Sequence, residues 1–311
     1  MNILSEINAL ALNNPEKLIL DAEHSYYNEI EKLVNTLKSN PDYKILLLSG
    51  PSASGKTTTA HIIKTALCNT GISAEVVSLD NFYLSVDKMP LQENGEPDFE
   101  SVYSLDIPAI HRCFFDAVKY GKTDIPLFDF QKKKRSENTH KIDISNNGVL
   151  IVEGLHALNP VLTDTLNAEN VFKVYISVND FVYDDNGEEV ISSRRIRLSR
   201  RISRDYIYRG TAALGTLKLW TSVVEGEEKY LYPYKDLADM MFKTFHSFEC
   251  SVFRNIYFEL LKDLPETAPN YEYAISVKDA LEKFVPLSAD LVPQDSLIRE
   301  FIPGGLYENV K

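Results

Sequence analysis

The chain has 311 residues, of which 44% are hydrophobic and 25% charged, as is ordinary for a globular protein with one large or two small domains. Its formal net charge of −12 argues against general binding to nucleic acids or to anionic membranes. The cysteines Cys68, Cys113 and Cys250 lie far apart without a C-x-x-C motif, so we expect reduced thiols, no zinc site and a cytoplasmic location.

Residues 1–43 are predicted to form a helical N-terminal extension. They show no signal-peptide pattern, and no apolar run in the sequence is long enough to span a membrane. Apolar side chains recur at helical spacing until Pro41 ends the pattern. They are Ala22, Tyr26, Ile30, Leu33 and Leu37. We expect this helix to pack on the flank of the next domain rather than to bind a partner.

The sequence is organised around residues 50–57, which match the pattern G-x-x-x-x-G-K-[ST]. A strand is predicted before this loop at 45–48 and a helix after it at 58–67, the context that the motif requires. The backbone N–H groups and the helix N-terminus would face phosphate oxygens, Lys56 would reach the terminal phosphates, and Thr57 would ligate Mg²⁺. The residues expected to bind the nucleotide are Gly50, Ser52, Ala53, Ser54, Gly55, Lys56, Thr57 and Thr58.

Two carboxylates are expected at strand ends near this loop. A second strand is predicted at 74–79 and is followed by Asp80, and a buried parallel strand at 149–152 runs into Glu153. Ligands of open α/β sheets bind at the carboxyl ends of the strands. Asp80 would accept a proton from a substrate hydroxyl or help to hold Mg²⁺, and Glu153 would hold Mg²⁺ through water.

A long connection separates these two strands, and connections of this length are often functional. Residues 85–106 are predicted to be a loop, and 108–120 a helix that ends at Gly121. The basic run 132–135 is interpreted as a solvated loop, with the alternative that one of its side chains meets the substrate.

The stretch 194–209 is rich in arginine, and its spacing places four guanidinium groups on one helical face. They are Arg197, Arg200, Arg201 and Arg204, and Arg209 follows them. Only Asp205 offsets this charge locally. Because arginine suits bidentate binding of phosphates, we expect the face to meet an anion, with at least one arginine structural. Further elements are predicted as strands at 171–178 and 238–242 and helices at 211–224, 245–261 and 277–284.

In their order and spacing these motifs resemble the uridine kinase and phosphoribulokinase family of P-loop kinases. The matching segments are G-P-S-A-S-G-K-T at 50–57, S-L-D-N-F-Y at 78–83, V-E-G at 152–154, R-L-S-R-R-I-S-R-D at 197–205, R-G at 209–210 and Y-K-D-L-A-D at 234–239. The resemblance covers roughly residues 44–245. Closer still are bacterial nucleoside kinases, whose N-terminal TGS-like region would be replaced here by the short helical extension.

The resemblance implies a three-layer α/β P-loop fold, a parallel five-stranded sheet with helices on both faces. It implies a kinase domain over 44–262 with an arginine-rich lid near 194–210, and a tail over 263–311 that packs on the domain or on a partner subunit. ATP is the implied donor, with Mg²⁺, and the implied acceptor is a nucleoside 5′-hydroxyl, uridine foremost, in pyrimidine salvage. A homo-oligomer is also implied.

The resemblance assigns roles to individual residues, with Asp80 as general base and Glu153 as the Mg²⁺-linked acid. The catalytic set that it implies is Lys56, Asp80, Arg201 and Arg204. The set implied for the nucleoside is Asp80, Tyr83, Phe99, Glu100, Phe128, Lys133 and Arg201. The set implied for Mg²⁺ is Thr57, Asp80 and Glu153, and Arg209 is implied on the ATP side.

Two departures concern the choice of acceptor. Uridine–cytidine kinases commonly carry a His where this chain has Lys133 and an Arg where it has Thr211, and both positions help to read the pyrimidine. The alternative acceptors are cytidine, another nucleoside, or a sugar phosphate as in phosphoribulokinase. The aromatic residues Phe82, Tyr83, Phe99 and Phe128 favour a flat base over a bare sugar phosphate. A non-catalytic nucleotide-binding switch is a further alternative. A nucleic-acid role for the arginine helix is disfavoured by the net charge.

Overall fold

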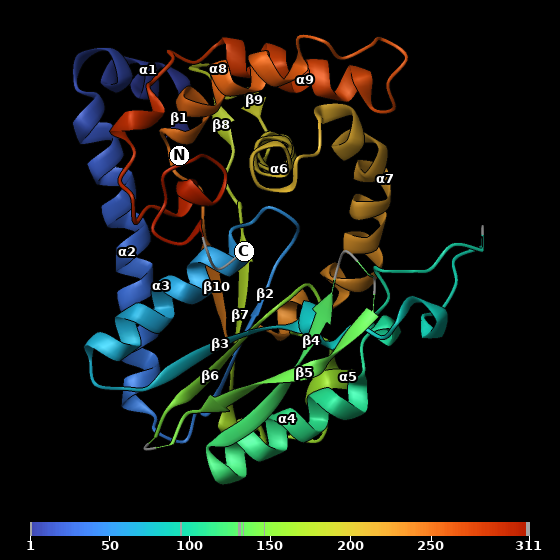
Figure 1. Ribbon diagram of the computed structural model, residues 1–311. Helices are drawn as coiled ribbons and strands as arrows, with labels where there is room; N and C mark the ends of the chain where they lie inside the picture. The colour runs from blue at the N-terminus through green and yellow to red at the C-terminus, as the bar shows by residue number, and fades with distance from the viewer. Residues whose placement is uncertain (1, 94, 130–131, 133, 146, 309–311) are drawn as a thin grey trace.

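The computed structural model describes residues 2–93, 95–129, 132, 134–145 and 147–308. Its centre is a parallel five-stranded sheet in the order β10-β7-β2-β6-β3 (Figure 1). The strands are β2 (Ile45–Ser49), β3 (Ala74–Ser78), β6 (Val149–Glu153), β7 (Val171–Ser177) and β10 (Met240–Lys243). Helices cover both faces, which confirms the predicted three-layer α/β fold.

Alternation along β2 divides the core in two. Ile45 and Leu47 point into one apolar cluster and Leu46 and Leu48 into the other, because successive side chains of a strand face opposite sides. The first face is covered by α4 (Ile107–Tyr120) and α5 (Pro160–Thr163), and the second by α2 (Pro15–Ser39) and α3 (Lys56–Asn69). Burial on both faces explains why this strand is continuously apolar.

A third apolar cluster lies beyond the sheet, at the top of Figure 1. It gathers α1 (Leu4–Asn13), α6 (Ser193–Arg209), α7 (Ala213–Tyr230), α8 (Glu249–Leu261) and α9 (Tyr271–Glu282), with the short strands β8 (Val182–Tyr183) and β9 (Glu189–Ile191). The strand β1 (Asn2–Ile3) pairs with β8. Ile7, Trp220 and Phe301 belong to this one cluster. The cluster therefore contains side chains from the predicted N-terminal extension, kinase domain and C-terminal tail. The domain boundaries at 43/44 and 262/263 stay a prediction.

An antiparallel hairpin occupies the stretch around the basic run. It consists of β4 (Lys122–Asp129) and β5 (Lys134–Asp143), and Lys134 and Arg135 pair with Asp129 and Phe128. The interpretation of 132–135 as a loop is therefore wrong for these two residues. Most of β5 is exposed, so backbone pairing holds a strand whose polar sequence carries no alternating pattern.

Two findings bear on the environment of the chain. Within the described ranges, no helix is both long and apolar enough to cross a membrane. Cys68 is exposed, Cys113 and Cys250 are buried, and all three are free thiols.

A buried ion pair ties α6 to α8. Arg200 Nε lies 2.6 Å from Glu249 Oε2, and both side chains are 0% exposed. We expect Arg200→Met to lower the free energy of unfolding by about 3–5 kcal/mol, because it leaves the Glu249 carboxylate buried without its cation. Arg194 lies on the same helix as Arg200 and forms an exposed ion pair with Glu228 of α7. Arg194→Met is therefore expected to lower the free energy of unfolding by less than about 1 kcal/mol. Urea denaturation measures both variants, and equal losses would contradict this account.

Candidate active site

The register of the strands brings the predicted site residues to one edge of the sheet. β6 lies between β2 and β3, and Glu153 at its end pairs with Leu48 on one side and with Ser78 on the other. The P-loop follows β2, and Asp80 follows β3 in the short 3-10 helix η1 (Leu79–Phe82). Glu153 therefore stands between the P-loop and Asp80, where the carboxyl ends of parallel strands meet.

The P-loop backbone is tightly curled. A Cβ atom at Gly50 would lie 2.2 Å from the carbonyl oxygen of Ile176, so only glycine fits where the loop leaves β2. Gly55 has a φ of 90° at the start of α3, and Ala53 has a φ of 59°, a conformation that a residue with a side chain rarely adopts. A curled backbone that leads into a helix N-terminus is suited to anion binding.

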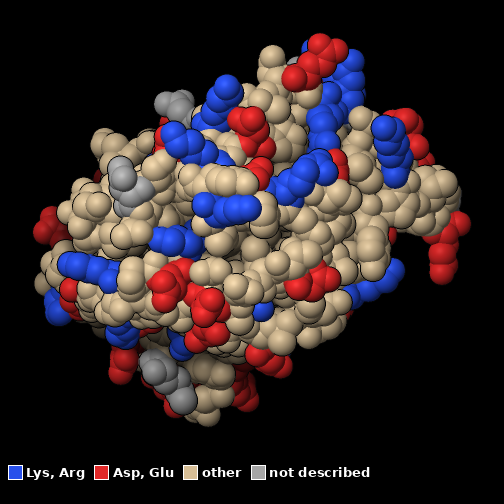
Figure 2. Space-filling view, turned by 90° about the horizontal axis from the view of Figure 1, so that it is seen from below, with Lys and Arg blue, Asp and Glu red and all other residues tan. Residues whose placement is uncertain are grey.

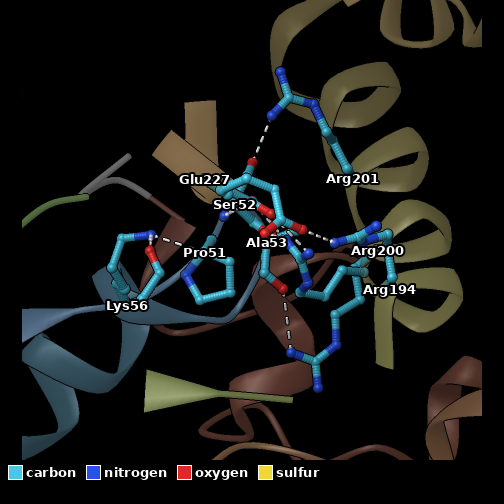
Figure 3. Close-up of polar contacts among 11 residues, drawn as sticks. Pro51, Ser52, Ala53, Lys56, Arg194, Arg200, Arg201 and Glu227 are labelled. Atoms are coloured by element: carbon cyan, nitrogen blue, oxygen red, sulfur yellow. Dashed lines mark hydrogen bonds and ion pairs between the residues drawn. The ribbon is translucent and has the colours of Figure 1, made fainter. Parts of the chain in front are cut away.

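Lys56 reaches back across its own loop. Its Nζ donates to the carbonyl oxygens of Gly50 (2.8 Å) and Pro51 (3.0 Å), as Figure 3 shows. Burial lowers the pKa of Lys56, and the nearby carboxylates of Glu153 and Glu300 oppose that effect. An ammonium group with three donors can exchange such neutral acceptors for phosphate oxygens.

A buried pair from the helices beyond the sheet holds the P-loop at Ser52. The Ser52 N–H donates to Glu227 Oε1 (2.8 Å), and Arg197 Nη1 donates to the Ser52 carbonyl oxygen (3.0 Å) and to Glu227 Oε1 (2.7 Å). Arg197 and Glu227 are 2% and 0% exposed. Both polar groups of the Ser52 peptide are thus fixed by side chains from α6 and α7, which we expect to set the shape of the loop.

Arg200 makes the second link between α6 and the P-loop. Its guanidinium pairs with Glu249 and donates to the carbonyl oxygens of Thr244 (2.7 Å) and Ala53 (3.3 Å). Figure 3 shows α6 and its arginines beside the loop. At least one arginine was expected to be structural, and Arg197 and Arg200 are both engaged in buried ion pairs.

Three further arginines of α6, Arg201, Arg204 and Arg209, line the space above the P-loop. Arg201 Nη1 donates to Ser52 Oγ (2.5 Å), and Arg204 donates to Asp205 Oδ1 (2.8 Å). Arg209 Nη1 lies 3.2 Å from the same carboxylate. Burial raises the pKa of Asp205, but the three guanidinium groups outweigh it and lower that pKa. One carboxylate shared among three cations leaves positive charge to offer to an anion.

These groups border a recess of about 210 Å³. The P-loop contributes Lys56 and Thr57, the strand ends contribute Asp80 and Glu153, and α6 contributes Arg201 and Arg204. The predicted residues Tyr83, Glu100 and Arg209 line it as well. The recess therefore brings together most of the residues that the sequence assigned to the site; their individual roles stay predictions.

The carboxylates at the strand ends have raised pKa values. Burial and the neighbouring charge of Asp80 raise the pKa of Glu153 to about 7. Asp80 is reached by solvent through the recess but is enclosed by protein elsewhere, and this desolvation raises its pKa against the opposing charge of Lys56. Two carboxylates held close together at neutral pH are suited to a shared cation.

The donor set at this position fits Mg²⁺. Asp80, Glu153 and the Thr57 hydroxyl supply hard oxygen ligands beside a phosphate-binding loop, and Mg²⁺ is usually held by one or two carboxylates together with substrate phosphates and water. In the part of the chain that the structure describes, no cluster of three or more His, Cys, Asp or Glu could hold a metal by itself. Such a site would take its metal together with the nucleotide.

Aromatic side chains adjoin the recess where the nucleoside is predicted. The Tyr83 ring lies 5.9 Å from that of Phe99 and 5.7 Å from that of Phe128, measured between centroids, and its hydroxyl donates to the Phe99 carbonyl oxygen (2.9 Å). Glu100 follows in the same loop. Lys133, the remaining residue predicted for the nucleoside, lies outside the described residues.

Sequence reasoning missed the acidic residues that reach the P-loop from a distance. Glu227 accepts from the Ser52 N–H and Glu300 from the Thr58 N–H (3.1 Å). The surplus of arginine at 194–209 signalled that acidic partners were needed, but it did not say which ones. Nothing in the sequence marked Glu300, which lies far along the chain from the loop.

A wider groove of about 870 Å³ lies between α4 and the hairpin, away from the P-loop. Two ion pairs lie at this groove, Lys122 with Asp143 and Arg135 with Asp106. Figure 2 shows the face seen from below, on which basic and acidic side chains are interspersed. Among the described residues, none of those predicted for the site lines this groove.

Comparison with known proteins gives a consistent family. Residues 45–250 match the model of the phosphoribulokinase / uridine kinase family. A uridine kinase of Halobacterium salinarum is 26% identical over 198 residues, which is 62% of this chain and 77% of that protein. A uridine kinase of Mycoplasma genitalium is 29% identical over 180 residues, 58% of this chain and 75% of that protein.

Two further comparisons differ in how much of each protein they cover. A uridine kinase of Schizosaccharomyces pombe is 27% identical over 196 residues, and the match spans 60% of this chain but only 38% of that protein. Among solved structures, a possible uridine kinase from Bacillus stearothermophilus superposes with a TM-score of 0.48 at 18% identity, covering 70% of this chain and 98% of that one.

The stability of the protein without ligand is expected to depend on the protonation state of Glu100. Burial raises the pKa of Glu100 to about 7, although Arg201 opposes the shift. The folded protein therefore holds this proton more tightly than the unfolded chain, and stability is lost as pH rises from the unfolded pKa of about 4.5 through 7. We expect Glu100→Gln to raise the melting temperature by about 2–4 °C at pH 8 and by less at pH 5.

The control is Glu225→Gln, which alters an exposed carboxylate of α7 and is expected to leave the melting temperature unchanged at both pH values. Thermal melts without ligand measure all three proteins. A Glu100→Gln variant less stable than the wild type at pH 8 would mean that the attraction to Arg201 outweighs the cost of burial.

Proposed function

This chain belongs to the phosphoribulokinase and uridine kinase family, and from that premise we propose that it transfers the γ-phosphoryl group of ATP to the 5′-hydroxyl of a nucleoside, with uridine as the preferred acceptor. The observation that carries the proposal is the meeting of Lys56, Asp80 and Glu153 in one recess at the carboxyl edge of the sheet. Phosphoryl transfer needs mainly positioning and charge stabilisation, and these residue types supply both.

Asp80 is assigned the proton transfer. Its side chain is exposed and lines the recess, so an acceptor hydroxyl can approach it. The raised pKa that desolvation gives Asp80 makes it a better proton acceptor than a solvated aspartate. In this role Asp80 orients the hydroxyl and takes its proton as the oxygen attacks phosphorus.

The phosphates are assigned to the P-loop and the lid. The backbone N–H groups after Ser52 and the Lys56 ammonium would hold them, and Arg201 and Arg204 would neutralise the charge of the transferred group. Arg209 would lie on the ATP side. Closure of these arginines over the recess would exclude water and limit hydrolysis of ATP.

Mg²⁺ would be held by Thr57 and Glu153 with Asp80 beside them. When bound, the metal neutralises phosphate charge and orients the leaving group. Glu153 contributes to this site from a strand end that is fixed by pairing on both sides, so its carboxylate needs little reorganisation when the nucleotide arrives.

The acceptor pocket is assigned to Tyr83, Phe99, Glu100 and Phe128, and Lys133 stays a further prediction for it. The cluster of edge-to-face and tilted aromatic rings suits a flat base, and a carboxylate suits the ribose hydroxyls. The names of the relatives support uridine, giving UMP in pyrimidine salvage. The free thiols fit the cytoplasm as the compartment.

The choice of acceptor is tested by ADP release from ATP and Mg²⁺ in the presence of uridine, cytidine, purine nucleosides or ribulose 5-phosphate. We expect the largest kcat/KM with uridine. A larger value with another acceptor would keep the kinase and overturn the base assignment. ADP release that no acceptor stimulates would overturn the kinase proposal and favour a nucleotide-dependent switch.

Asp80→Asn is expected to lower kcat by about 10²–10⁴-fold, because it removes the proton acceptor while keeping the shape of the side chain. Binding of ATP, measured by calorimetry, is expected to be retained. Asp87→Asn, at an exposed position nearby on the same connection, serves as the control and should keep full turnover. Near-normal kcat in Asp80→Asn would remove this residue from its role.

A further inference from the structure

The C-terminal segment reaches the P-loop. Figure 1 shows it, in red, winding between α2 and α6. Leu297, Ile298, Phe301 and Ile302 are fully buried. The segment includes the short 3-10 helix η7 (Leu297–Glu300), which lies against α3.

Hydrogen bonds fix this segment to the lid helix α6. Ser203 Oγ donates to the carbonyl oxygen of Phe301 (2.6 Å), and the Tyr208 hydroxyl donates to that of Ile302 (2.9 Å). The Arg200 guanidinium lies 4.9 Å from the centre of the Phe301 ring. The same helix therefore carries the arginines of the recess and holds the C-terminal segment.

Two side chains of the segment touch the phosphate-binding loop itself. Leu297 lies directly on Gly55, where its Cδ1 would be 2.5 Å from an added Cβ. Glu300 is 5% exposed, and its Oε2 accepts from the backbone N–H of Thr58 at 3.1 Å. Glu300 also lines the recess and acts electrostatically on Lys56 and Arg209.

The N–H groups of a P-loop and of the first turn of its helix are donors for the α- and β-phosphates of a nucleotide. In this chain the Glu300 carboxylate accepts the hydrogen bond of one of these donors, the Thr58 N–H. A carboxylate matches a phosphate group in charge sign and in hydrogen-bond acceptance, so it satisfies the Thr58 N–H and partly balances the Lys56 and Arg209 charges.

We propose that Glu300 is an internal stand-in for a phosphate group, so that the nucleotide must displace its carboxylate from the P-loop in order to bind. The proposal rests on the proposed function, since it requires the loop to bind nucleotide phosphates. Because the buried neighbours of Glu300 tether it beside the loop, the carboxylate competes at a high effective concentration. Its displacement is passed to α6 through the bonds from Ser203 and Tyr208.

The test is the affinity of the full chain for ADP and for inorganic pyrophosphate, measured by titration calorimetry without an acceptor. Glu300→Gln keeps the size of the side chain and removes its charge. We expect it to bind both ligands about tenfold more tightly than the wild type, because the competing anion is gone. Asp295→Asn is the matched control, since its carboxylate accepts from the Tyr27 hydroxyl rather than from the P-loop, and it should bind like the wild type.

Glu300→Asp keeps the charge on a shorter arm and is expected to lie between the wild type and Glu300→Gln, which preserves the test if the Gln variant does not fold. Tighter binding of ADP without tighter binding of pyrophosphate would overturn the proposal, because the competition must be for phosphate. Equal or weaker binding by both Glu300 variants would also overturn it. If neither the wild type nor any variant bound ADP or pyrophosphate, the proposed function itself would fail.

Discussion

The architecture of the site depends on the buried pairing of two α6 guanidinium groups with carboxylates and with the backbone of the P-loop. Arg197 with Glu227 fixes both polar groups of the Ser52 peptide, and Arg200 with Glu249 reaches the next carbonyl oxygen. Each charge is almost completely buried, so the loss of one partner leaves the other without compensation. The loop from the sheet and the helix that carries the lid are therefore built as one unit.

The recess beside this unit holds several carboxylates close to one another and several guanidinium groups close to one another. Burial raises the pKa values of Asp80, Glu153 and Glu100, and it lowers that of Arg201 to about 10. Perturbed groups that gather in one recess are typical of functional sites, because a charged ligand relieves what the free protein must tolerate. In our account, phosphate groups bind to the cations of the recess, and a metal ion binds between its carboxylates.

The elements that the sequence predicted correctly are those that a short run of neighbouring residues determines. The continuous apolar run at 45–48 predicted a buried strand, the spacing from Gly50 to Lys56 predicted the P-loop, and Gly121 predicted the end of α4. The β4–β5 hairpin was missed because its second strand is polar and exposed. The partners Glu227 and Glu300 were missed because long-range pairing leaves no trace in the neighbouring residues. The same limit hid the start of α9 at Tyr271, after the left-handed Asn270.

The most direct test of the central claim is to identify the product of the reaction by ³¹P NMR, with ATP, Mg²⁺ and uridine incubated with the full chain. The account predicts that the ATP γ-phosphoryl signal is replaced by that of a nucleoside 5′-monophosphate, in an amount equal to the ADP formed. Conversion of ATP to ADP and inorganic phosphate alone, with uridine unchanged, would contradict it.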